Sequence, residues 1–165
     1  MKLKNKRPIL LGTLLLIIVI ILTAIIGYYT KETYEVTDVN ENLDAMGLAL
    51  LQSEAEVVSL LGYKGDYRLC VHGYNYTYKD LQLEIGFRNN DDRVRSITFN
   101  ESPYTVYRLV AGISVDDARQ VLLNEHEYTK APDSDYTFIK DDVKIIVLSQ
   151  DGQTVRGYTI ELISK

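Results

Sequence analysis

The chain has 165 residues, which is enough for one ordinary domain or two small ones. Its charge is divided unevenly. Residues 1–27 carry four basic and no acidic side chains, whereas residues 28–165 carry 14 basic and 23 acidic ones, a net charge of −9. Phosphate backbones and anionic headgroups repel such an acidic domain, so nucleic acid is not an expected partner.

The N-terminal segment has the pattern of a membrane anchor. Residues 9–26 are uncharged and almost entirely apolar, and at about 1.5 Å per residue a helix of this length spans the hydrocarbon core of a bilayer. A cleaved signal peptide is the alternative, but its apolar core is shorter and a small-x-small site follows it. The basic residues before the helix predict a cytoplasmic N-terminus. We therefore expect a cytoplasmic tail at 1–7, a single-pass signal-anchor helix at 8–28, and the remaining chain outside the cell membrane.

An internal repeat is the most informative feature of the outer part. After a polar stalk at 29–38, residues 50–61 resemble residues 113–124 at an offset of 63, and both segments have the pattern of short amphipathic helices. Ser53 and Asp116 fit the N-cap positions of these helices. Three later pairs of apolar segments also match, at offsets of 60 to 62: 76–78 with 136–138, 81–85 with 143–147, and 94–99 with 155–160.

The order of these segments predicts the fold class. Each half reads as helical residues followed by three strands with hairpin turns between them. The prediction is an α+β domain of two repeated units, 39–102 and 103–165. Each unit combines short helices with a three-stranded antiparallel meander.

The start of the second unit carries a family resemblance. Residues 104–118, with Gly112 before the helix, resemble the opening of the tandem helix-helix-β-meander units in the β-lactamase-inhibitor protein and SmpA/OmlA lipoprotein superfamily. The first unit departs from this pattern, because Ala49 stands where Gly112 would align. The inhibitor has disulfides, which one cysteine cannot supply. The resemblance implies an α+β fold and binding to another protein, and no functional residue is carried over.

Few residues suggest chemistry. Cys70, the one cysteine, is expected to be a small buried side chain or to form an intermolecular disulfide, and Cys70 with His72 has no third group to complete a catalytic set. The run Glu125-His126-Glu127 lacks metal-ligand spacing. The paired acids 91–92, 116–117 and 141–142 fall at predicted turns or a helix start, where Asp favours local hydrogen bonds. No enzyme activity, cofactor or metal is expected.

The strand pattern predicts a binding face. Tyr74, Tyr76 and Tyr78 alternate and are expected in the core, although tyrosine is also common at interfaces. A sheet covered by helices on one face leaves the other face open. The residues expected on that open face are Gln82, Glu84, Arg88, Lys144, Ile146 and Leu148. Because Ile146 and Leu148 are apolar, we expect part of this face to be covered, either by the other unit or by a partner.

These observations predict a membrane-anchored extracytoplasmic protein-binding module without catalysis. Its expected partners are the membrane, through residues 8–28, and another extracytoplasmic protein. The alternative is a structural subunit of a cell-envelope assembly, held through its transmembrane helix.

Overall fold

The computed structural model describes residues 16–24, 36–101 and 103–163, which belong to two compact units, one within 1–34 and one within 35–165. Residues 16–24 are helical, and their apolar side chains are exposed. Among the described residues, no helix has both the length and the apolar character needed to cross a membrane. The other residues of the predicted tail and helix, 1–15 and 25–28, lie outside the described residues.

The C-terminal end of the predicted stalk belongs to the folded domain. Residues 36–41 form a helix, and the side chains of Val36 and Val39 are buried in the core. Residues 36–38 of the predicted stalk therefore belong to the folded domain, because they begin this helix and the side chain of Val36 is buried in the core. Residues 29–35 lie outside the described residues.

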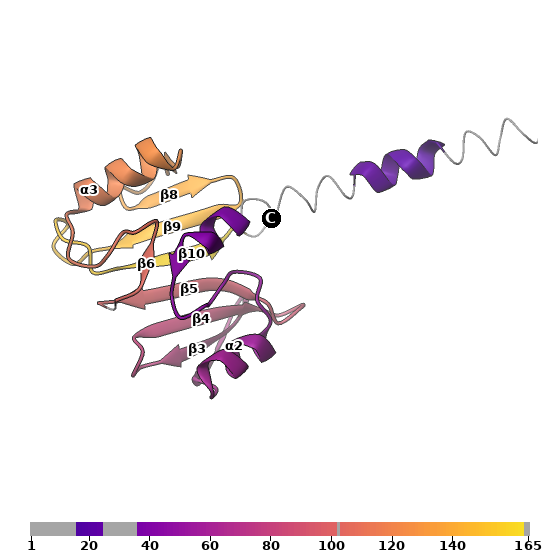
Figure 1. Ribbon diagram of the computed structural model, residues 1–165, viewed down its shortest axis with the longest axis horizontal. Coiled ribbons are helices and arrows are strands. Elements are labelled where there is room, and N and C mark those ends of the chain that lie inside the picture. Colours follow the sequence, from indigo (N-terminus) through magenta and orange to yellow (C-terminus); the bar gives the residue numbers. More distant parts are fainter. Residues whose placement is uncertain (1–15, 25–35, 102, 164–165) are drawn as a thin grey trace, which may run out of the picture. The chain divides into compact units, whose positions relative to one another are not determined.

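The compact unit within 35–165 is built around an antiparallel sheet (Figure 1), which has eight strands among the described residues. The strand order is β2-β3-β4-β5-β10-β9-β8-β7, and a separate pair joins β1 to β6. The elements are β1 Leu43–Asp44, α2 Glu54–Leu61, β2 Asp66–Cys70, β3 Gly73–Tyr78, β4 Leu83–Arg88, β5 Val94–Asn100, β6 Thr105–Val106, α3 Val115–Gln120, the π-helix η1 Val121–Glu125, β7 Thr129–Lys130, β8 Thr137–Lys140, β9 Val143–Leu148 and β10 Gly157–Leu162. The α+β fold class is confirmed.

The sheet has four strands in each half, β2–β5 and β7–β10, where the sequence predicted three. The two additional strands lie at the outer edges of the sheet. All but the last residue of β2 are exposed, and β7 has only two residues, so neither strand carries the buried alternation that identified the others.

The two halves join edge to edge through their last strands. In the antiparallel pairing of β5 with β10, Thr98 lies opposite Thr159, and their hydroxyl oxygens are 2.9 Å apart. Ile97 pairs with Ile160, and Phe99 pairs with Tyr158. Residues 97–99 thus meet residues 158–160 in a pairing that is symmetric about the two threonines.

Several backbone hydrogen bonds recur 61 residues apart. The N–H of Leu51 donates to the carbonyl of Val94, and the N–H of Gly112 donates to the carbonyl of Val155. The bonds of Val94 to Gln52 and of Glu54 to Asp92 likewise match those of Val155 to Ile113 and of Val115 to Gln153. The segments before the two helices therefore run through equivalent paths at an offset of 61.

The helix caps follow the same offset and correct the predicted alignment. Ser53 caps α2 in a capping box with Glu56, and Ser114 caps α3 by accepting from the N–H of Asp117 at 3.0 Å. The prediction of Asp116 as the N-cap is wrong, because Ser114 occupies that position and Asp116 lies in the first turn. The offset of 63 missed the serine two residues earlier.

The residue equivalent to Gly112 is also different from the one predicted. Gly112 has a left-handed φ of 93°, and 61 residues earlier Leu51 has a φ of 66°. Gly112 therefore corresponds to Leu51 and not to Ala49. A leucine in this conformation is strained, since its Cβ crowds the backbone. Because the first half has leucine where the second half has glycine, the glycine pattern does not identify Leu51.

The core lies on one face of the sheet. The buried residues of the central strands alternate along each strand, for example Leu83, Ile85 and Phe87 in β4 and Val143, Ile145 and Val147 in β9. The helices lie on this side of the sheet in Figure 1. Tyr74, Tyr76 and Tyr78 are buried with them, as expected from their spacing.

Candidate protein-binding surface

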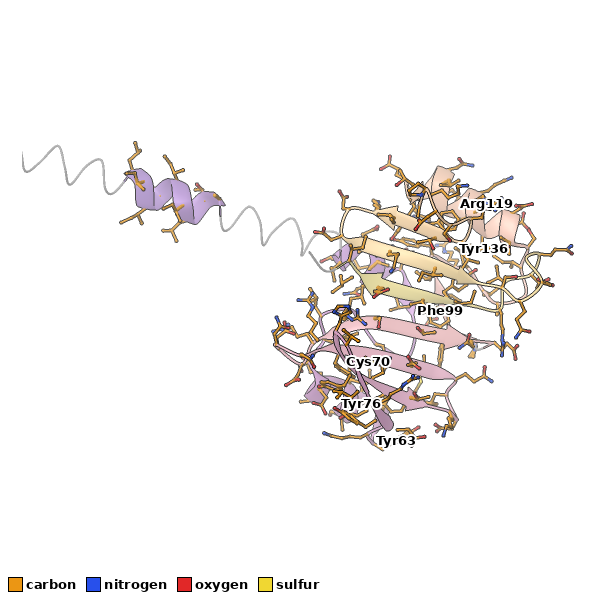
Figure 2. The ribbon with its side chains drawn as sticks, turned by 180° about the vertical axis from the view of Figure 1, so that it is seen from behind. Tyr63, Cys70, Tyr76, Phe99, Arg119 and Tyr136 are labelled. Carbon is orange, nitrogen blue, oxygen red and sulfur yellow. The ribbon has the colours of Figure 1, made fainter. Side chains whose placement is uncertain are left out.

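The opposite face of the sheet carries the residues between the buried ones, and Figure 2 shows the strands from this side, in front of the helices. Five of the six residues predicted for the open face lie on it: Glu84 and Arg88 from β4, and Lys144, Ile146 and Leu148 from β9. All five are partly exposed. Gln82 does not belong to the face, because it lies in the turn before β4 with a φ of 53°.

The predicted residues form two groups rather than one. β4 and β9 are separated by β5 and β10, so Glu84 and Arg88 do not adjoin the residues of β9. Side chains of the two central strands fill the space between the groups. The sequence did not identify these central residues as part of the face, although their alternation within the segments 94–99 and 155–160 could have done so.

Charged groups at the centre of the face are paired with one another. Glu161 of β10 lies 3.0 Å from the guanidinium of Arg95 and 2.8 Å from the amine of Lys144. In the neighbouring half, the side-chain amide of Asn75 donates to Glu84 at 2.6 Å. A face whose charges already have partners offers little to a small charged ligand, because binding would have to break these pairs.

A depression of about 430 Å³ lies where β9 ends, within the size range of ligand and peptide pockets. Ile146 and Leu148 contribute apolar side chains to its lining, and Tyr136, labelled in the upper half of Figure 2, contributes an aromatic one. Val147 also lines the depression, although its side chain is buried in the core. Its remaining lining residues are polar: Asn100, Ser134, Ser149, Gln150 and Arg156. The lining thus combines apolar and polar side chains.

The first half of the domain contributes Asn100 of β5 to the lining of this depression but does not lie over it. The halves are joined edge to edge by β5 and β10, so they share one sheet and do not stack face to face. The prediction that packing between the units covers Ile146 and Leu148 is therefore wrong. Both side chains remain partly exposed.

The tyrosines of β3 form a network with α2 on the core side. Glu54 accepts from the hydroxyls of Tyr76 at 2.7 Å and Tyr74 at 3.0 Å, and Lys64 lies 2.7 Å from the same carboxylate. The hydrogen bond from Lys64 is the largest of the effects that hold the pKa of Glu54 below its usual value. Burial, followed by the bond to Glu54, raises the pKa of Tyr74 and of Tyr76. This network fastens the start of α2 to β3 and accounts for the tyrosines as structural residues.

Cys70 and His72 do not form a catalytic pair. Cys70 ends β2 and is partly buried, with its thiol 3.9 Å from the carbonyl oxygen of Arg68, whereas His72 is exposed in the following turn. The sequence predicted a small buried side chain or an intermolecular disulfide, and in the structure Cys70 is only partly buried.

The segment Glu125-His126-Glu127 does not converge on a common point. The ring of His126 packs against that of Tyr107, with centroids 3.9 Å apart, and Glu127 has a left-handed φ of 59°. Of the other paired acids, Asp92 accepts from Tyr74 and Asp116 pairs with Arg119. Among the described residues, no group of three His, Cys, Asp or Glu side chains is arranged to hold a metal ion.

The comparisons with known proteins give no further information on this surface. No protein-family model, no curated protein and no solved structure matches the chain. The resemblance to the β-lactamase-inhibitor protein and SmpA/OmlA lipoprotein superfamily therefore stays a prediction.

Proposed function

We propose that the chain is a membrane-anchored, extracytoplasmic protein-binding module that captures its partner on the open face of the sheet. The observation that supports this most directly is the depression at the end of β9, whose lining combines the apolar side chains of Ile146 and Leu148 with polar side chains. Protein interfaces commonly combine apolar residues with polar ones. Because the charges at the centre of the face are already paired, an apolar anchor of the partner is the expected main contact.

The duplicated scaffold is part of the same proposal. The recurring hydrogen bonds, the matching caps at Ser53 and Ser114, and the symmetric pairing at Thr98 and Thr159 support two repeated units. Their tandem order is also what the family resemblance implies. We place the units within the predicted bounds 39–102 and 103–165, with residues 36–38 added to the first.

The site-specific test places a photoreactive amino acid at Leu148 in the full-length chain in cells. A matched control carries the same group at Gln82, which is exposed but lies outside the face. The proposal expects a discrete crosslinked product from position 148 and none from position 82. Adding Ile146→Lys to the first variant should abolish the product, since a charge then replaces an apolar side chain of the lining. Equal products at both positions, or a product that Ile146→Lys leaves unchanged, would contradict the proposal.

A structural subunit held through its helix is the second candidate. The exposed apolar side chains from Leu16 to Leu22 favour it, since they offer a surface to lipid or to another helix. The two candidates separate when an unrelated transmembrane helix replaces residues 8–28. Crosslinking at Leu148 should persist if the sheet face holds the partner, and should disappear if the native helix is the contact.

A further inference from the structure

Strand β2 has an unused edge. Within the part of the chain that the structure describes, β2 pairs with β3 alone and forms one end of the sheet. Tyr67, Leu69 and Val71 are 60%, 69% and 89% exposed, respectively. Long edge strands with apolar side chains invite pairing with another strand, and proteins usually shield them. At the opposite end of the sheet, β7 has only two residues, and one of them is Lys130. Short length and a lysine are two features that protect an edge strand from such pairing.

The hairpin fixes which backbone groups of β2 point away from the sheet. Cys70 and Gly73 flank a two-residue turn, so they form a hydrogen-bonded pair. Antiparallel residues alternate between bonded and non-bonded pairs. Cys70, Arg68 and Asp66 therefore direct their N–H and C=O groups to β3, whereas Tyr67 and Leu69 direct theirs outward. Such groups are satisfied best by another extended strand.

The side chains of β2 are suited to pairing with another strand. The ring of Tyr67 packs against those of Tyr74 and Tyr76, with centroids 5.6 and 6.1 Å away, so it is held in place at the border of the core. Asp66 and Arg68 lie on the other face of β2. Arg68 has no ion-pair partner among the described residues, and Asp66 forms an exposed pair with Lys79.

The charges point to a second copy of the chain as the partner. In an antiparallel pairing of β2 with β2 centred on Tyr67, Asp66 of each copy lies opposite Arg68 of the other. This residue pair is of the non-bonded type, in which side chains are closest. A pairing centred on Arg68 would instead place the two guanidinium groups opposite each other, which is unfavourable. We propose that the chain forms a symmetric dimer through β2, in the register centred on Tyr67. This proposal is independent of the sheet-face partner, because it uses a different surface.

The single cysteine allows the register to be measured. A nitroxide label on Cys70 of the full-length chain in detergent reports the distance between the two copies by pulsed dipolar spectroscopy. With about 3.4 Å per residue along a strand and about 4.8 Å between strands, the Tyr67 register places the two Cα atoms about 21 Å apart. Registers centred on Arg68 and Leu69 give about 14 Å and about 8 Å.

Charge reversal tests the partner independently of the label. Arg68→Asp should weaken the dimer about tenfold or more, since each Asp66 then faces an aspartate, and the double variant Asp66→Arg with Arg68→Asp should restore it. Lys130→Asp on β7 is the matched control and should leave the dimer unchanged.

A backbone variant tests the edge itself. Leu69→Pro removes an outward N–H and should abolish dimerisation, while the β2–β3 ladder keeps its own hydrogen bonds. Circular dichroism checks its fold, and the charge variants remain informative if it does not fold.

Three results would overturn the proposal. One is a chain that stays monomeric up to about 100 µM. This holds also where β2 of the monomer binds an unrelated extended segment. Another is a dimer with a Cα separation near 8 or 14 Å. The last is a dimer that Arg68→Asp does not weaken.

Discussion

The junction of the two halves should be intolerant of a methyl group at Gly157. A Cβ built on Gly157 would lie 2.0 Å from the carbonyl oxygen of Phe99 and 2.9 Å from the Cα of Asn100, both backbone atoms of the neighbouring strand. Van der Waals contact needs more than 3 Å, so β10 must move away from β5 by about 1 Å. Two or three ladder hydrogen bonds at about 1 kcal/mol each are weakened by such a shift. Gly157→Ala should therefore lower the free energy of unfolding by about 2–3 kcal/mol.

The assay is urea unfolding of the full-length chain, followed by circular dichroism. A matched control is Gly86→Ala in β4, whose Cβ would lie 2.3 Å from the Oγ of Ser96. That hydroxyl can rotate away, so the cost should stay below about 1 kcal/mol. A Cβ on Gly112 would meet no atom within 4 Å, but the residue has a φ of 93°. Gly112→Ala should therefore lower the free energy of unfolding by about 1 kcal/mol through backbone strain alone. A Gly157→Ala variant no less stable than Gly86→Ala would refute the tight junction.

The remaining predictions concern caps and titration. Ser53→Ala and Ser114→Ala should each cost about 1 kcal/mol in urea unfolding, since each serine caps a helix. Backbone N–H groups lower the pKa of Asp151 from 3.8 to about 2. The ionised carboxylate therefore stabilises the fold above pH 4, and this stabilisation is lost as the pH falls to 2. In urea unfolding at several pH values, Asp151→Asn should remove that dependence. The hydrogen bond to Asp80 raises the pKa of Tyr63 from 10 to about 12, so its stabilisation is complete below pH 10 and is lost towards pH 12. Tyrosinate absorbance should show one tyrosine titrating lower in Asp80→Asn.

The sequence predicted the part of the fold that depends on burial. The alternation of Leu83 and Ile85, and of Ile145 and Val147, identified strands because one face of each is in the core. β2 was missed because all but the last of its residues are exposed, although Tyr67 and Leu69 do alternate with charged residues. Burial patterns detect central strands well and edge strands poorly.

The candidate surface was predicted only in part, for a related reason. The alternation of residues along the strand placed Ile146 and Leu148 opposite the buried residues, and in β9 both are partly exposed between buried neighbours. Parity does not specify strand order, so the separation of β4 from β9 by the two central strands could not be foreseen. The pairing of Thr98 with Thr159 is a contact between residues far apart in the chain, and only the tertiary structure supplies it.

The difference between the two edges decides what kind of assembly the domain can form. If both edges were long and free, β2 of one copy could pair with β7 of the next, and this head-to-tail contact would extend without limit. β7 is too short for that, with two residues against five in β2. A pairing of β2 with β2 uses the same edge on both copies and leaves no free long edge, so the assembly closes at two. The two halves of the sheet thus differ most in their edge strands, β2 and β7. Because only β2 is long enough to pair, the proposed association is limited to a dimer.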